Sequence, residues 1–237
     1  MTAGSIKKEL RKNANLAKAK VTRGFFKTGK GQYGEGDVFL GLTSKQTYVV
    51  AQKYKNAPLS CLDTLLKSKV HEDRVCALRV LVFQFQAGDE TIRRKIYNFY
   101  LTNAKKVNSW DLVDLSADKI IGVYLVKKDK KILYKLAVST NLWERRIAIV
   151  ATFNFIKNNQ FGDTLGLAKI LLNDKHDLIH KAVGWMLREV GKRDREAEEK
   201  FLRKYYQQMP RTMLRYSIEK FPENLRQQYL TSKITIN

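Results

Sequence analysis

A tryptophan and an aspartate, Trp110 and Asp114, lie four residues apart in the stretch VNSWDLVDLS. On a helix this spacing brings two side chains to one face. A carboxylate held there can stabilise a developing positive charge, and an indole face attracts cations. The pair therefore has the side chains for chemistry at a cationic centre. The alternative is an acidic residue in the solvated first turn of an ordinary helix.

The segment GKGQYGEGD at 29–37 has the glycine spacing of a dinucleotide-binding fingerprint. That fingerprint requires a strand before it, whereas the preceding KAKVTRGFFK is helical in pattern. We therefore interpret 29–37 as a flexible connection between helices. A second interpretation stays open, in which Lys27, Lys30 and several glycine amides contact phosphate.

Two histidines, His176 and His180, have the spacing of a helical metal-binding pair. The zinc-protease motif needs Glu directly after the first His, and this chain has Asp177 there. No third ligand stands out, so we expect no metal. Capping of a helix by Asp174 or Asp177 is the better interpretation.

Charge limits the classes of partner. The 237 residues include 45 Lys and Arg against 23 Asp and Glu, for a formal net charge of +22. Such an excess favours a polyanion, with an acidic membrane surface as the competitor. We find no apolar run of spanning length and no secretion signal, and we expect a cytoplasmic, nucleoid-associated protein. The two cysteines, Cys61 and Cys76, form no disulfide or zinc pattern and are expected to be buried.

Ten basic residues recur along the same stretch as the tryptophans: Lys105, Lys106, Arg145, Arg146, Lys181, Arg188, Lys192, Arg193, Arg211 and Arg215. A solvated surface always carries some lysine and arginine, but the excess is larger than solubility requires. The backbone of DNA or RNA is the better explanation, and binding should then weaken steeply with salt.

The elements that must position these residues are helices. Apolar residues recur at three- and four-residue spacing over 130–138, 144–156 and 176–190. The three prolines, Pro58, Pro210 and Pro222, lie where helices are expected to begin. Only the terminal KITIN is β-like, and we expect a frayed tail over 231–237. The sequence therefore predicts an all-α fold with an N-terminal helical segment over 1–28.

A degenerate repeat of 36 residues links four windows, HEDRVCAL at 71, VNSWDLVD at 107, WERRIAIV at 143 and IHKAVGWM at 179. This period is typical of HEAT-like arrays of paired helices, although amphipathic helices also resemble one another by chance. The repeat predicts one HEAT-like α-α superhelix over 1–237.

The repeat also predicts which residues share a surface. Trp110 and Arg146 occupy equivalent positions in successive repeats, and Asp114 and Trp185 lie on the corresponding helical faces. The four should converge on one concave surface. A core would use apolar residues at all four positions, so the mixture predicts a polar, accessible surface.

Three motifs, SWDLVD (109–114), LWERRIAI (142–149) and HKAVGWMLRE (180–189), resemble the AlkD-like DNA alkylation-repair glycosylases, which are built from HEAT-like repeats. The resemblance runs from about residue 20 to 230. It implies hydrolysis of the N-glycosidic bond of N3- or N7-alkylated purines in duplex DNA. It also implies catalytic roles for Asp114, Trp110, Trp185 and Arg146, with no deep pocket for a flipped base.

We expect further DNA contacts at two positions that the resemblance matches, Phe25 and Asn154, and at basic residues that the charge excess and the loop indicate, Lys27, Lys30, Arg145, Lys181, Arg188, Arg211 and Arg215. Two of these positions depart from the family pattern. Asn154 replaces a lysine found in some members, and Phe25 replaces an N-terminal tyrosine.

We therefore expect a monofunctional glycosylase that initiates base excision repair as a monomer on double-stranded DNA, alkylated or branched, without a cofactor. Two alternatives remain. One is a non-catalytic HEAT-like protein that binds damaged or branched DNA, and the other is a protein-interaction scaffold, which the net charge disfavours.

Overall fold

The computed structural model describes residues 1–234, and within that range it contains helices and no β-strand. The predicted all-α fold class is confirmed. The chain divides into two compact units, Met1–Ser116 and Ala117–Asn237. The assignment of a single domain to 1–237 stays a prediction, and the expected tail at 231–237 lies partly outside the described residues. None of the helices between residues 1 and 234 has the length and apolar character needed to cross a bilayer.

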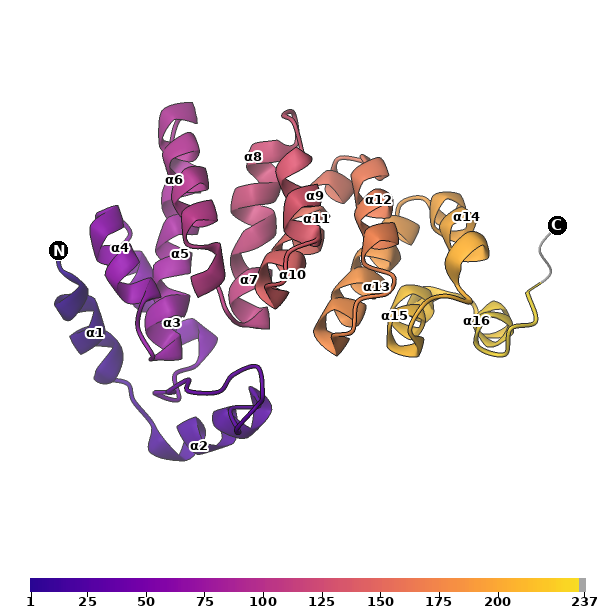
Figure 1. Ribbon diagram of the computed structural model, residues 1–237. Helices are drawn as coiled ribbons and strands as arrows, with labels where there is room; N and C mark the ends of the chain where they lie inside the picture. The colour runs from indigo at the N-terminus through magenta and orange to yellow at the C-terminus, as the bar shows by residue number, and fades with distance from the viewer. Residues whose placement is uncertain (235–237) are drawn as a thin grey trace. The chain divides into compact units, whose positions relative to one another are not determined.

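The first unit surrounds one buried helix. Its elements are α1 (Ala3–Arg11), α2 (Leu16–Phe25), α3 (Ser44–Lys53), α4 (Leu59–Leu66), α5 (His71–Ala87), α6 (Glu90–Thr102), the 3-10 turn η1 (Ala104–Lys106) and most of α7 (Trp110–Ala117). Helix α5 packs against α1, α3, α4 and α6. Figure 1 shows α3, α4 and α6 beside it. Most of its residues are buried, which is expected of a helix with neighbours on several sides.

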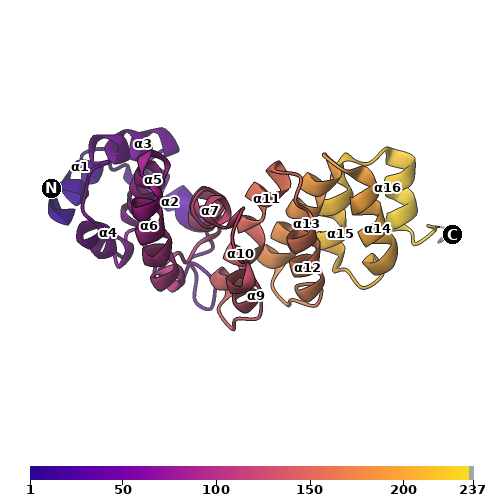
Figure 2. The same ribbon diagram turned by 90° about the horizontal axis from the view of Figure 1, so that it is seen from above.

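The second unit is also a stack of packed helices. Its elements are the π-helical turn η2 (Asp118–Gly122), α8 (Val123–Leu125), α9 (Lys131–Ala137), α10 (Leu142–Ala151), α11 (Phe153–Lys157), α12 (Gly162–Ile170), α13 (Asp177–Gly191), α14 (Arg195–Tyr205), α15 (Arg211–Ser217), the 3-10 turn η3 (Ile218–Lys220) and α16 (Glu223–Leu230). Helix α13 is central, because it packs against α10, α12, α14 and α15 (Figure 2).

The sequence signals for helices agree with these elements. Each proline immediately precedes a helix, α4, α15 or α16, where its missing N–H breaks no helical hydrogen bond. The four repeat windows overlap α5, α7, α10 and α13. Their identity as HEAT-like repeats stays a prediction. The helix expected over 144–156 is divided between α10 and α11 at Thr152, whose hydroxyl donates to the Ile149 carbonyl at 2.7 Å.

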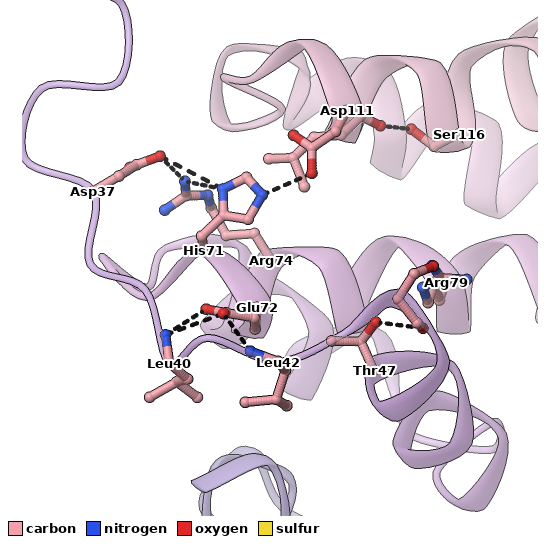
Figure 3. A network of polar contacts seen from close by, with 12 residues as sticks. Asp37, Leu40, Leu42, Thr47, His71, Glu72, Arg74, Arg79, Asp111 and Ser116 are labelled. Atoms are coloured by element: carbon pink, nitrogen blue, oxygen red, sulfur yellow. Dashed lines mark hydrogen bonds and ion pairs between the residues drawn. The ribbon is translucent and has the colours of Figure 1, made fainter. Parts of the chain in front are cut away.

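The first turn of α5 holds the connection between α2 and α3 in place. The Glu72 carboxylate accepts hydrogen bonds from the amides of Leu40, Gly41 and Leu42 at 2.8–3.2 Å (Figure 3). Gly41 has a φ of 77°, and a Cβ there would lie 2.3 Å from the Asn15 carbonyl oxygen. Only glycine therefore allows this close approach.

Candidate active site

Trp110 begins α7, and its indole packs on an aromatic cluster of the first unit. The ring stacks on Phe26 with a centroid distance of 5.4 Å and an interplanar angle of 14°. Phe25 meets it edge-on at 5.8 Å. Phe26 in turn packs on Phe39 at 5.0 Å. The end of α2 and the loop after it therefore hold the indole, and Phe25 remains 65% exposed beside it.

Asp114 lies on α7 one turn after Trp110, as the sequence predicted. Both residues are half-buried, whereas Leu112 and Val113 between them are fully buried. Helix α7 therefore directs two apolar side chains into the core and keeps the indole and the carboxylate on a partly accessible face.

A buried polar network that the sequence did not predict supports the start of α7. The Nε2 of His71 lies 2.7 Å from an oxygen of Asp111 (Figure 3). Its Nδ1 lies 3.6 Å from Asp37, which also accepts a hydrogen bond from Arg74 at 2.6 Å. The imidazole stacks on Phe39, with a centroid distance of 4.8 Å. The one available signal was the charged run HEDR at the start of α5.

The network changes the acidity of both partners. Burial opposes the charge of the imidazolium, but hydrogen bonds to Asp111 and Asp37 raise the pKa of His71 above its ordinary value. Burial also opposes the charge of Asp111, and its contact with His71 lowers the pKa of that carboxyl. Together the two shifts favour an ion pair between a protonated histidine and an ionised aspartate.

We expect this ion pair to make stability depend on pH. A raised pKa in the folded state means that protonated His71 stabilises fully below the unfolded value of 6.5, and that this contribution disappears as pH rises through the folded pKa. The free energy of unfolding of native protein should exceed that of His71→Gln most below pH 6.5, and the difference should shrink at higher pH. Urea titrations at several pH values measure it. A difference that stays constant with pH would show that folding leaves the pKa of His71 unchanged, and would contradict the ion pair.

Arg146 lies on α10 in the second unit and corrects one expectation. The predicted surface is accessible, but Arg146 is only 4% exposed. Its Nη1 donates to the Leu178 carbonyl at 2.5 Å. Helix α10 is covered on several sides, and its next residue, Ile147, is fully buried as well. The accessible guanidinium predicted from the repeat is therefore wrong, and in this structure Arg146 joins α10 to α13.

Trp185 and Asn154 lie near each other in the second unit. Trp185, on α13, is half-buried and packs on Phe153 at a centroid distance of 5.7 Å. Asn154 follows Phe153 on α11 and accepts a hydrogen bond from Asn158 at 3.3 Å. The structure thus brings one predicted catalytic residue next to the helix that carries Asn154. The convergence of these residues with Trp110 and Asp114 stays a prediction.

The basic residues proposed for DNA contact fall into two groups. Lys27, Lys30, Arg211 and Arg215 are exposed. Three others form ion pairs within the second unit. Arg145 binds Asp174 at 2.6 Å, Lys181 binds Asp177 at 2.6 Å, and Arg188 binds Glu219. The first group is therefore the more available to phosphate.

The glycine-rich loop forms its own hydrogen bonds. The Gly29 amide donates to the Gln32 side chain at 2.9 Å, and the Gly31 amide donates to Glu35 at 2.8 Å. The Gly34 amide donates to the Lys27 carbonyl at 3.2 Å. These three amides already have acceptors, so the alternative in which they contact phosphate is not supported. Helix α2 precedes the loop, as the sequence predicted, in place of the strand that a dinucleotide fingerprint requires.

The histidine pair serves the start of α13. The ring of His176 accepts from the Leu178 amide at 3.1 Å, and the ring of His180 lies 2.5 Å from the Asp174 carbonyl. His176 itself caps the helix, in place of the expected Asp174 or Asp177. In the part of the chain that the structure describes, no three potential metal ligands cluster. Cys61 and Cys76 are buried, as expected.

Comparisons with known proteins agree with this fold. A family model described as DNA alkylation repair enzyme matches residues 6–221. A solved structure described as a predicted DNA alkylation repair enzyme from Enterococcus faecalis is similar, with a TM-score of 0.67 and 15% sequence identity. The similarity covers 89% of this chain and 97% of that one. No curated protein matches significantly. Because the family model covers most of its length, the chain belongs to the DNA alkylation repair enzyme family.

Proposed function

We propose that this protein is a monofunctional DNA glycosylase that hydrolyses the N-glycosidic bond of N3- or N7-alkylated purines in duplex DNA. Family membership supports a role in the repair of alkylated DNA. The finer proposal depends on one observation above all. Asp114 lies at a half-buried position one helical turn from Trp110, and the indole of Trp110 contacts the exposed ring of Phe25.

The chemistry needs few groups from the protein. An alkylated purine carries positive charge, so it departs readily and needs little assistance from an acid. Its departure leaves a deoxyribose with oxocarbenium character. Asp114 would stabilise that charge and orient the attacking water, while the indole of Trp110 flanks the sugar. The reaction uses no lysine nucleophile, so strand cleavage through a Schiff base should be absent.

The decisive experiment is incubation with methylated duplex DNA, followed by measurement of released 3-methyladenine and 7-methylguanine. Release without strand cleavage supports the proposal, and Asp114→Asn is the control for a contaminating activity. Tight binding without release supports the second candidate, a non-catalytic protein for damaged or branched DNA. The positions Asn154 and Phe25 favour that candidate, because both depart from the pattern that the sequence resembles.

We expect the affinity for duplex DNA to fall steeply with salt and to depend little on sequence. The reason is the net charge of +22 together with the absence from the sequence of a recognisable motif that reads the major groove. Titration of labelled duplexes across a salt series measures both effects. An affinity that does not change with salt would contradict binding to a polyanion.

A further inference from the structure

The first unit has a basic cavity, and neither Trp110 nor Asp114 lines it. A cavity of about 460 Å³ opens between the loop at 35–37, the connection from α4 to α5, and the segment at 105–108. Its charged lining residues are Lys67, Lys69, Arg74, Lys105 and Lys106, with Glu35 and Asp37. Positive side chains therefore outnumber negative ones in the wall.

The two acidic residues of the wall are already engaged. Asp37 accepts a hydrogen bond from Arg74 at 2.6 Å and lies 3.6 Å from the ring of His71. Glu35 accepts from the Gly31 amide at 2.8 Å. Neither carboxylate forms an ion pair with a lysine of the cavity among the described residues. The lysines therefore keep a net positive field at the opening.

Two of the four lysines that line the cavity form ion pairs. Lys67 and Lys106 share the carboxylate of Asp63, which lies 3.3 Å from the Lys106 Nζ. Lys69 and Lys105 differ, because both are exposed and neither forms an ion pair within residues 1–234. These two ammonium groups come from different parts of the chain and border one cavity. Two lysines without an ion pair in the described residues therefore border the same cavity.

The wall also contains a buried guanidinium. Arg74 is buried, and its guanidinium has one carboxylate partner, Asp37, and the Ser68 carbonyl at 2.8 Å. Its Nε has no hydrogen-bond acceptor among the described residues. The wall of the cavity therefore contains a buried guanidinium nitrogen without an acceptor.

We propose that this cavity binds a phosphate group, with Lys69 and Lys105 as its ligands. Ammonium groups are compact point charges that bind phosphate oxygens through short, charge-assisted hydrogen bonds. The volume exceeds that of a single phosphate and accommodates a phosphodiester with part of its sugar. The source is a backbone phosphate of the duplex, an identification that rests on the proposed function. Inorganic phosphate has the same chemistry and is the alternative source.

The test compares two double variants that remove the same charge. Lys69→Ala with Lys105→Ala empties the cavity of its free ammonium groups. Lys45→Ala with Lys55→Ala removes two exposed lysines of the same unit that do not line it. Unmodified duplex DNA is titrated at several salt concentrations. If each ammonium neutralises one phosphate, the cavity variant should reduce the slope of log affinity against log salt by about 1.8, and the control by less.

A second titration distinguishes a phosphate of the duplex from inorganic phosphate as the ligand. It also separates failure of this site from failure of the proposed glycosylase activity. Inorganic phosphate is added to native protein and to the cavity variant, and amide chemical shifts of Gly36 and Asn108 are followed by NMR. Free phosphate is supported as the ligand if these chemical shifts saturate in native protein and not in the cavity variant, while the two proteins bind DNA with the same affinity and salt slope. Equal salt slopes for the two double variants, together with no phosphate-dependent shifts, overturn the proposal. Base release is measured separately, so a protein that excises bases but fails both titrations disproves this site and not the glycosylase.

Discussion

Asp114→Asn is expected to lower the rate of base excision by about 100- to 1000-fold, the usual cost of losing electrostatic stabilisation of a transition state. The substitution keeps the size of the side chain and removes its charge, so the sugar cation loses its counter-ion. Affinity for duplex DNA should stay the same or increase slightly, because removal of an anion eases the approach of phosphate. Single-turnover release of 3-methyladenine measures the rate, and titration of labelled duplex measures the affinity.

The matched control is Asp129→Asn, which removes one carboxylate from an exposed position before α9. It should leave the excision rate unchanged and affect binding as any surface charge does. If Asp114→Asn excises as fast as the parent protein, Asp114 is only part of the first turns of α7. Its carboxylate would then be the solvated acid of an ordinary helix, without a role at a cationic centre.

Glu198→Gln is expected to stabilise the protein at neutral pH. Glu198 lies on α14, is 1% exposed, and has one carboxyl oxygen without a hydrogen-bond partner among the described residues. Burial raises the pKa of Glu198 to about 8 from an ordinary value of 4.5. The folded state therefore holds a neutral acid at pH 7, whereas the unfolded state ionises.

The sign of the effect follows from this difference. A raised folded pKa means that the contribution to stability is full below pH 4.5 and is lost as pH rises towards 8. Glutamine matches the protonated acid in shape and does not ionise when the chain unfolds. Glu198→Gln should therefore raise the free energy of unfolding by about 3 kcal/mol at pH 7 and by almost nothing at pH 4. Urea unfolding at both pH values measures the difference.

The adjacent acid provides a control of opposite sign. Glu199 forms ion pairs with Arg195 at 3.0 Å and with Arg203 at 3.5 Å. Glu199→Gln removes these pairs and should slightly lower stability at pH 7, within the range of about 0–1 kcal/mol typical of exposed pairs. A stabilisation by Glu199→Gln equal to that by Glu198→Gln would mean that general charge reduction, and not burial of Glu198, is the cause.

The helices were predictable from the sequence because apolar spacing is a local property. Residues 130–138 and 176–190 carry an apolar face at helical spacing, and α9 and α13 form there. The position of Asp114 relative to Trp110 was predictable for the same reason, since four residues on one helix define a face. Neither inference needed knowledge of what packs against the helix.

The surroundings of the candidate residues were not predictable, because they depend on distant parts of the chain. The partner of Arg146 is the backbone carbonyl of Leu178, and no side-chain pattern encodes a bond to a carbonyl 32 residues away. His71 and Asp111 are 40 residues apart, and each looks like an ordinary residue at a helix start. The packing of Phe26 under Trp110 depends in the same way on the loop that Glu72 holds.

The first turn of α5 also has a consequence for how the chain acquires its structure. Its side chains form hydrogen bonds with residues 37 and 40–42, which precede it in the sequence, and with residue 111, which follows it. The partners are 30 to 40 residues apart in the sequence. Closing such loops costs more entropy than winding a helix or joining neighbouring helices, so we expect these contacts to form late in folding. During synthesis from the N-terminus, His71 has no partner in α7 until residue 111 has left the ribosome. The support for Trp110 is therefore completed only after the whole of the first unit has been made.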